Sequence, residues 1–264
     1  MSTNRHRILE AFLACCLFAT PTKADTTTAP NEAATPVNQR QTSGNTCGPA
    51  ALISSFRCGN TAWQRGAQAL PDGTDHEQIV LWIRRHGLQP SSTLKNRKRW
   101  TRDGINVEDL VVAANEMTRP LYLPPVTGDD LFLRRSERPE QLLRRTHEQL
   151  ARSLAKGIPP LLSLRRFVLR KGHWTPIEGH FITITAVPRK LAREEHSFVI
   201  RYLDPWGGKR GEGSISLPNH DLLHSPGQSA PCLHAILPDA HVGKNQVRPG
   251  EKTALVPAAM IGRW

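Results

Sequence analysis

The sequence has few aromatic residues, few cysteines and no long apolar run. Of its 264 residues, 6% are aromatic and 5 are cysteine. No segment approaches the roughly 18 consecutive apolar residues of a membrane-spanning helix, so an integral membrane protein is not expected. The histidines lack the close spacing of metal ligands, and neither a phosphate-binding glycine loop nor a zinc-finger pattern occurs. We therefore predict no metal and no cofactor.

Acidic residues are scarce relative to basic ones. The chain has 35 Lys and Arg against 23 Asp and Glu, which gives a formal net charge of +12. A basic protein favours anionic partners such as acidic envelope polymers or an anionic membrane face. The basic residues are spread along the chain, however, as is typical of a solvated face. Anionic polymers are thus possible partners, and no specific nucleic acid is indicated.

Residues 1–24 have the pattern of a secretory signal peptide. Arg5 and Arg7 precede an apolar stretch at 11–19, and small residues lead to a cleavage site after Ala24. A frayed N-terminal helix is the alternative. The pattern predicts an exported protein, either periplasmic or secreted.

The cysteines divide between the signal and the rest of the chain. Cys15 and Cys16 lie in the apolar stretch, but the residues before them fit a lipid attachment site poorly, so lipid anchoring is not expected. After cleavage Cys47, Cys58 and Cys232 remain, and three cysteines leave at least one free thiol. One interpretation is a disulfide between Cys58 and Cys232 with Cys47 reduced. The other is that Cys58 and Cys232 are both buried and unpaired.

Composition divides the rest of the chain into three parts. Residues 25–38 are rich in Thr, Ala, Pro and Asn and predict a flexible linker. The folded domain is expected to span 39–240. Residues 241–264 are expected to form a loosely attached C-terminal tail, because a loop-like segment from Lys244 to Lys252 precedes them.

Hydrophobic periodicity changes within the expected domain. The first part has the period of helices, which we expect at 47–56, 62–69, 75–86, 107–117 and 140–156. The second part has short β-rich runs, which predict strands at 160–164, 180–187, 197–203, 214–217 and 232–237. Helices followed by an antiparallel sheet indicate an α+β domain.

Cys47 lies where an apolar helix is expected to begin. The segment from Gln41 to Leu52 is a polar turn followed by Cys-Gly-Pro-Ala-Ala-Leu. The free N–H groups and the dipole at a helix N-terminus favour negative charge, so a thiolate is stabilised there. Cys47 is therefore a candidate nucleophile, although a buried structural cysteine is the commoner role for such a residue.

A histidine and an aspartate complete a possible catalytic set. His180 follows a glycine at the expected start of a strand, and Asp204 ends the next strand in an Asp-Pro turn. A carboxylate one hairpin away can accept the second ring N–H of the imidazole and hold its tautomer. His173 is the rival base, but no strand is expected directly after it. Taken singly, a strand-end histidine and an Asp-Pro turn are ordinary features.

Together these residues resemble the papain-like cysteine peptidases, particularly the bacteriocin-processing peptidases that cut after double glycine. The resemblance covers about residues 39–217 and rests on Gln41, Cys47-Gly-Pro-Ala, Gly-His180-Phe and Asp204-Pro. It implies a two-lobed papain-like fold with Cys47 as nucleophile, His180 as base, Asp204 as the residue that orients it, and Gln41 as oxyanion donor. Thr46 departs from that group, which often has an acidic residue there.

These observations predict a thiol-dependent hydrolase of peptide or amide bonds that acts through a thioester, with a peptide or protein as substrate. Two other functions stay open. The same triad would serve an acyltransferase or a deamidase, and a papain-like domain can also be a non-catalytic binding module.

Overall fold

The computed structural model describes residues 25–218 and 233–264. The predicted signal peptide lies outside these residues. Within the described ranges, no helix is both long and apolar enough to cross a membrane.

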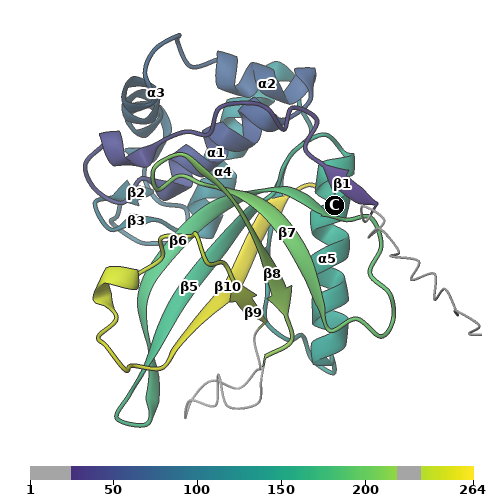
Figure 1. The fold of residues 1–264 in the computed structure, drawn as a ribbon. Coiled ribbons are helices and arrows are strands. Elements are labelled where there is room, and N and C mark those ends of the chain that lie inside the picture. The colour runs from purple at the N-terminus through teal and green to yellow at the C-terminus, as the bar shows by residue number, and fades with distance from the viewer. Residues whose placement is uncertain (1–24, 219–232) are drawn as a thin grey trace, which may run out of the picture.

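The centre of the structure is an eight-stranded antiparallel sheet (Figure 1). Seven strands follow the order β4-β10-β5-β6-β7-β8-β9, and β1 pairs with the end of β6. The strands are β1 Thr26–Thr28, β4 Thr127–Asp130, β5 Leu161–Arg170, β6 His173–Pro188, β7 Ser197–Asp204, β8 Lys209–Ser216, β9 His234–Ile236 and β10 Thr253–Gly262. A small hairpin, β2 Trp100–Thr101 and β3 Gly104–Ile105, lies outside this sheet.

All five expected helices are confirmed. They are α1 Cys47–Cys58, α2 Thr61–Gln68, α3 Asp75–Trp82, α4 Val107–Thr118 and α5 Pro139–Ala155. A π-helical turn, Ile83–Gly87, follows α3 and covers the rest of the helix expected at 75–86. The α+β class is therefore confirmed, with helices preceding most of an antiparallel sheet.

Short polar residues set the helix boundaries. Asn60 accepts hydrogen bonds from the backbone N–H groups of Ala62 and Trp63 and so caps α2. Thr74 and Glu77 form a capping box at the start of α3. Thr74 is thus the N-cap of that helix.

The helices pack in two groups (Figure 1). Helix α5 runs alongside the sheet, and its Leu142, Leu143, Leu150 and Leu154 join the core made with β5, β6 and β7. Helices α1 to α4 gather beyond one end of the sheet around a second core. Phe181 and Ile261 belong to that second core, so β6 and β10 reach from one core into the other.

Helix α1 is fixed to the sheet by buried hydrogen bonds. The Thr183 hydroxyl of β6 donates to the Ala51 carbonyl over 2.8 Å, and the Ser55 hydroxyl donates to the Pro159 carbonyl over 2.5 Å. Buried polar groups that find partners hold their elements in one arrangement. The start of α1 is thereby held next to β6.

The segment 25–38 is not a flexible linker. Strand β1 pairs antiparallel with residues 186–188 of β6, and Ala29 and Val37 are buried. The Val37 N–H donates to the Ser54 hydroxyl of α1 over 2.9 Å. Composition misled here, because backbone pairing and two well-placed apolar side chains order a segment that has few apolar residues.

The expectation of a loose tail at 241–264 is also wrong. Strand β10 lies between β4 and β5 in the sheet and is buried along almost its whole length. Pro257 hid this strand, since proline cannot donate to a neighbouring strand. The structure accommodates it with a register shift between Pro257 and Ala259.

Because β10 is a central strand, Met260→Ala should destabilise the protein by about 2–5 kcal/mol, as expected for a large-to-small change in a core. Met260 is 0% exposed. The control Ile236→Ala, at a side chain that is 53% exposed, should change stability by about 0.5 kcal/mol or less. Urea unfolding followed by circular dichroism measures both. Equal, small effects would contradict the central position of β10.

Candidate active site

Cys47 is the first residue of α1 and faces β6. Its side chain is almost buried, with 4% of the residue exposed. The β2–β3 hairpin can approach the helix start closely because residue 48 is glycine. A Cβ added to Gly48 would lie 2.6 Å from Ile105 and 3.5 Å from Phe181. Gly48 therefore serves the packing of α1 against the β2–β3 hairpin.

His180 lies on β6 where the strand becomes buried. Its Nε2 is 2.7 Å from Oδ1 of Asp204, and both side chains are 2% exposed. Burial by itself lowers the pKa of His180, but hydrogen bonds to Asp204 and Cys47 and their negative charges raise it to about 10. These neighbours therefore stabilise a positive charge on the His180 ring.

Asp204, at the end of β7, accepts three hydrogen bonds. Oδ1 accepts from His180 and from the Trp206 backbone N–H over 2.8 Å, and Oδ2 accepts from the His241 backbone N–H over 2.9 Å. Burial alone would raise the pKa of Asp204, but the bond to His180 and the two N–H donors lower it. The carboxylate is thus kept ionised and aimed at the ring.

Aromatic rings lie beside this carboxylate. Trp206 stacks on His241 with ring centroids 4.4 Å apart, and the Arg40 guanidinium lies 5.7 Å from the Trp206 ring centroid. Trp206 is 36% exposed, while Asp204 beneath its loop is 1% exposed. The His180 to Asp204 bond is thus buried, although the tryptophan of the turn after Asp204 is partly exposed.

A cleft of about 240 Å³ opens beside Cys47 and His180. The β2–β3 hairpin and the start of α4 line one side, and β5, β6 and β10 line the other. The charged residues on it are Asp103, Glu108, Asp130 and Arg165. The cleft is therefore acidic although the protein is basic.

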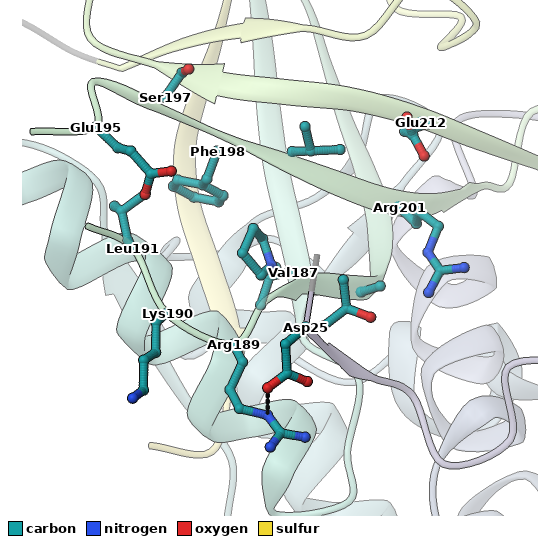
Figure 2. Close-up of a pocket in the computed structure, with 14 residues that line it drawn as sticks. Asp25, Val187, Arg189, Lys190, Leu191, Glu195, Ser197, Phe198, Arg201 and Glu212 are labelled. Carbon is teal, nitrogen blue, oxygen red and sulfur yellow. Dashed lines mark ion pairs between the residues drawn. The ribbon is translucent and has the colours of Figure 1, made fainter. Parts of the chain in front are cut away.

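A larger cavity of about 810 Å³ lies elsewhere, around the turn between β6 and β7. Figure 2 shows its lining, with Asp25 paired to Arg189 over 3.1 Å and charged residues of both signs around Val187 and Phe198. None of Cys47, His180 and Asp204 lines it. Its size alone does not make it the site of the chemistry.

The structure brings three of the four predicted site residues together and leaves Gln41 apart. Gln41 ends a 3-10 helix, Gln39–Gln41, and is exposed. It does not line the cleft, and its carbonyl accepts from Nδ1 of His76 over 2.8 Å. The residue that contacts the thiol is Asn45, whose Oδ1 lies 3.0 Å from Sγ of Cys47. Its place two residues before Cys47 is the only signal that the sequence offered.

His173 is excluded as the base by distance. It is the first residue of β6, is exposed, and pairs with Arg170 at the far end of the β5–β6 hairpin. Seven residues of extended strand place it about 23 Å from His180. A strand does follow His173 directly, which the sequence did not indicate because Pro176 and Gly179 interrupt the run.

The predicted disulfide involves one residue outside the described ranges, Cys232. Cys58 is the last residue of α1 and is fully buried, at 0% exposed. Burial raises the pKa of the Cys58 thiol to about 11. Among the residues that the structure describes, no group of three or more His, Cys, Asp or Glu is arranged to hold a metal ion.

Comparison with known proteins adds no relative. No family model, curated protein or solved structure matches the chain.

Iodoacetamide should alkylate Cys47 faster than Cys58. Cys47 lines the cleft beside His180, whereas Cys58 is 0% exposed and its raised pKa leaves almost no thiolate at neutral pH. Timed alkylation followed by peptide mass mapping measures both rates. Faster modification of Cys58 would contradict this geometry.

The raised pKa of His180 predicts a loss of stability in alkali. The contribution of His180 to stability is fully present below its ordinary pKa of 6.5 and is lost as pH rises through about 10. The free energy of unfolding should therefore fall more steeply over this range in the wild type than in Asp204→Asn, where the imidazolium lacks its carboxylate. Urea titrations at stepped pH test this, and parallel curves would contradict it.

Proposed function

We propose that this chain is a thiol-dependent hydrolase that cleaves peptide or amide bonds with a papain-like Cys47, His180 and Asp204 triad. The observation that carries the proposal is the buried His180–Asp204 pair with Cys47 on the wall of the same cleft, brought together from α1, β6 and β7. The resemblance to papain-like peptidases predicted these three residues in these roles. The two-lobed description of the fold belongs to the same proposal, with α1 to α4 as one lobe and the sheet as the other.

The geometry assigns a separate role to each ring nitrogen. Nε2 of His180 is hydrogen-bonded to Asp204. Nδ1 is therefore the ring nitrogen that can accept the proton of the Cys47 thiol. Proton transfer from Sγ to Nδ1 produces a thiolate and an imidazolium. The thiolate attacks the substrate carbonyl carbon, the S–C bond forms, and the π electrons move to the oxygen.

The same groups complete the reaction. When the tetrahedral intermediate collapses, the C–N bond breaks and the imidazolium gives its proton to the leaving amine. His180 then takes a proton from water, the hydroxide attacks the thioester, and the acid and the thiol are released. The Cys47 N–H, which lies in the first turn of α1 and has no intrahelical acceptor, points to a role in binding the oxyanion.

The charge of the cleft favours a peptide substrate over an anionic polymer. Asp103, Glu108 and Asp130 outnumber Arg165 at the cleft. The carboxylates also repel one another: burial, with Glu108 and Asp129 nearby, raises the pKa of Asp130. Anionic polymers would therefore contact the protein through basic residues away from the cleft.

Export is part of the proposal, and the start of the sheet is compatible with it. Cleavage after Ala24 would leave Asp25 as the first residue. The Asp25 carbonyl accepts from the Arg189 N–H over 2.7 Å, and β1 follows directly. Removal of the signal would thus keep every residue of the sheet.

The test is turnover of a peptide library by purified protein, with product masses identifying the reaction. Cys47→Ala and His180→Ala should each lower the rate by several orders of magnitude, because groups that act as a unit fail together. Asp204→Asn should lower it less, since an amide can still orient the ring. His173→Ala, at an exposed position about 23 Å along the strand, is the matched control and should have little effect.

Each outcome has a definite meaning. More than about a tenth of the wild-type rate in Cys47→Ala would refute the nucleophile, and a severe loss in His173→Ala alone would transfer the base. Hydrolysed products support a peptidase. Acyl transfer to an added amine, or conversion of Gln to Glu within intact peptides, would assign the same triad to an acyltransferase or a deamidase.

A further inference from the structure

The loop before the nucleophile is held by its backbone. The Asn45 N–H donates to the Arg102 carbonyl over 2.9 Å, and the Asn45 carbonyl accepts from Nε1 of Trp100 over 2.9 Å. Gly44, with φ of +81°, lets the chain turn there, and a Cβ on it would lie 3.2 Å from the Trp100 ring. Both partners come from the β2–β3 hairpin. The position of Asn45 is therefore independent of its own side chain.

The Asn45 side chain is aimed at the reacting sulfur. Its Oδ1 accepts from Sγ of Cys47 over 3.0 Å, and the residue lines the cleft. Its Nδ2 makes no hydrogen bond within the described residues and lies 3.6 Å from the position of a Cβ on Gly104. One half of the amide thus contacts the thiol, while two N–H donors are left for a bound molecule.

The two glutamines near the nucleophile do not reach the cleft, and the amide of Asn106, which does line it, is bound to Thr93 and to the Asp109 N–H. Gln41 has the six-residue spacing of an oxyanion donor, but its side chain is exposed away from the cleft lining. Gln39 is buried, with 4% of the residue exposed. Its backbone N–H donates a hydrogen bond to the Pro205 carbonyl over 2.8 Å. It does not line the cleft either. Within the described part of the chain, Asn45 is the residue whose side-chain amide forms a hydrogen bond with the Cys47 thiol.

We propose that Asn45, and not Gln41, is the side-chain donor that stabilises the oxyanion in this site. The inference rests on the proposed function and specifies its catalytic residues. Together with the Cys47 N–H at the start of α1, it would provide two donors for the oxyanion.

The amide changes its role when the proton leaves the sulfur. In the resting thiol, Oδ1 accepts the S–H. After the proton has moved to Nδ1 of His180, an acceptor beside the thiolate is repulsive, so the amide turns about its Cβ–Cγ bond and presents Nδ2–H. That N–H then donates to the oxygen that becomes negative as the S–C bond forms. No other atom or electron is required, and the amide turns back when the thiol is regenerated.

Two substitutions at Asn45 separate a donor from an acceptor. Asn45→Ala removes both functions, and Asn45→Asp keeps the shape and the acceptor oxygens but removes the donor. Both should lower kcat about 100-fold to 1,000-fold, the loss expected for one oxyanion donor, with little change in KM. Gln41→Ala is the matched control and should keep nearly wild-type kcat. Thermal unfolding should show all three variants folded, because the backbone bonds of Asn45 remain.

Several results would overturn the assignment. These are a wild-type kcat in Asn45→Ala, a wild-type kcat in Asn45→Asp, or a loss in Gln41→Ala as large as in Asn45→Ala. The triad is tested separately, since an inactive Cys47→Ala together with a fully active Asn45→Ala refutes only this inference. If Cys47→Ala is active, the proposed function itself fails.

Discussion

The approach of helix α1 to strand β6 is the contact on which the rest of the site depends. Cys47 and His180 belong to segments that are far apart in the sequence, so only packing can bring a thiol to an imidazole. The hydrogen bond from the Thr183 hydroxyl to the Ala51 carbonyl fixes the position of α1 relative to β6. Gly48 leaves room for Ile105 of the β2–β3 hairpin beside the helix start.

The second constraint is the burial of Asp204, which needs donors from several segments. A carboxylate that is 1% exposed is stable as an anion only when its oxygens are satisfied. The donors are the His180 ring, the Trp206 N–H of the following turn and the His241 N–H. The last lies in the segment that leads to β10. The C-terminal part of the chain therefore contributes to the site as well as to the sheet.

The sequence was informative where one local signal decides the outcome. The start of α1 at Cys47, the buried run from His180 and the turn after Asp204 could all be predicted. A polar turn before an apolar helix, a β-rich run and an Asp-Pro turn are signals that act over a few residues. Strand β10 could not, since Pro257 is tolerated only through a register shift that its neighbours allow. Residues 25–38 could not either, because their order comes from pairing with β6. Both errors concern strands whose partners lie far away in the chain.

Gln41 and Asn45 show the same limit within the site itself. A spacing of six residues places an amide beside a thiol only if the chain between them takes one particular path. Here residues 39–41 form a 3-10 helix, and the Thr42 hydroxyl binds the Gln39 carbonyl over 2.7 Å and the Thr46 hydroxyl over 2.6 Å. This path leaves Gln41 exposed. Gly44 then turns the chain under Trp100, so the amide that reaches the sulfur is the one two residues before it. The role of a side-chain amide near a nucleophile is therefore better assigned from the hydrogen bonds of its loop than from the number of residues that separate it from the nucleophile.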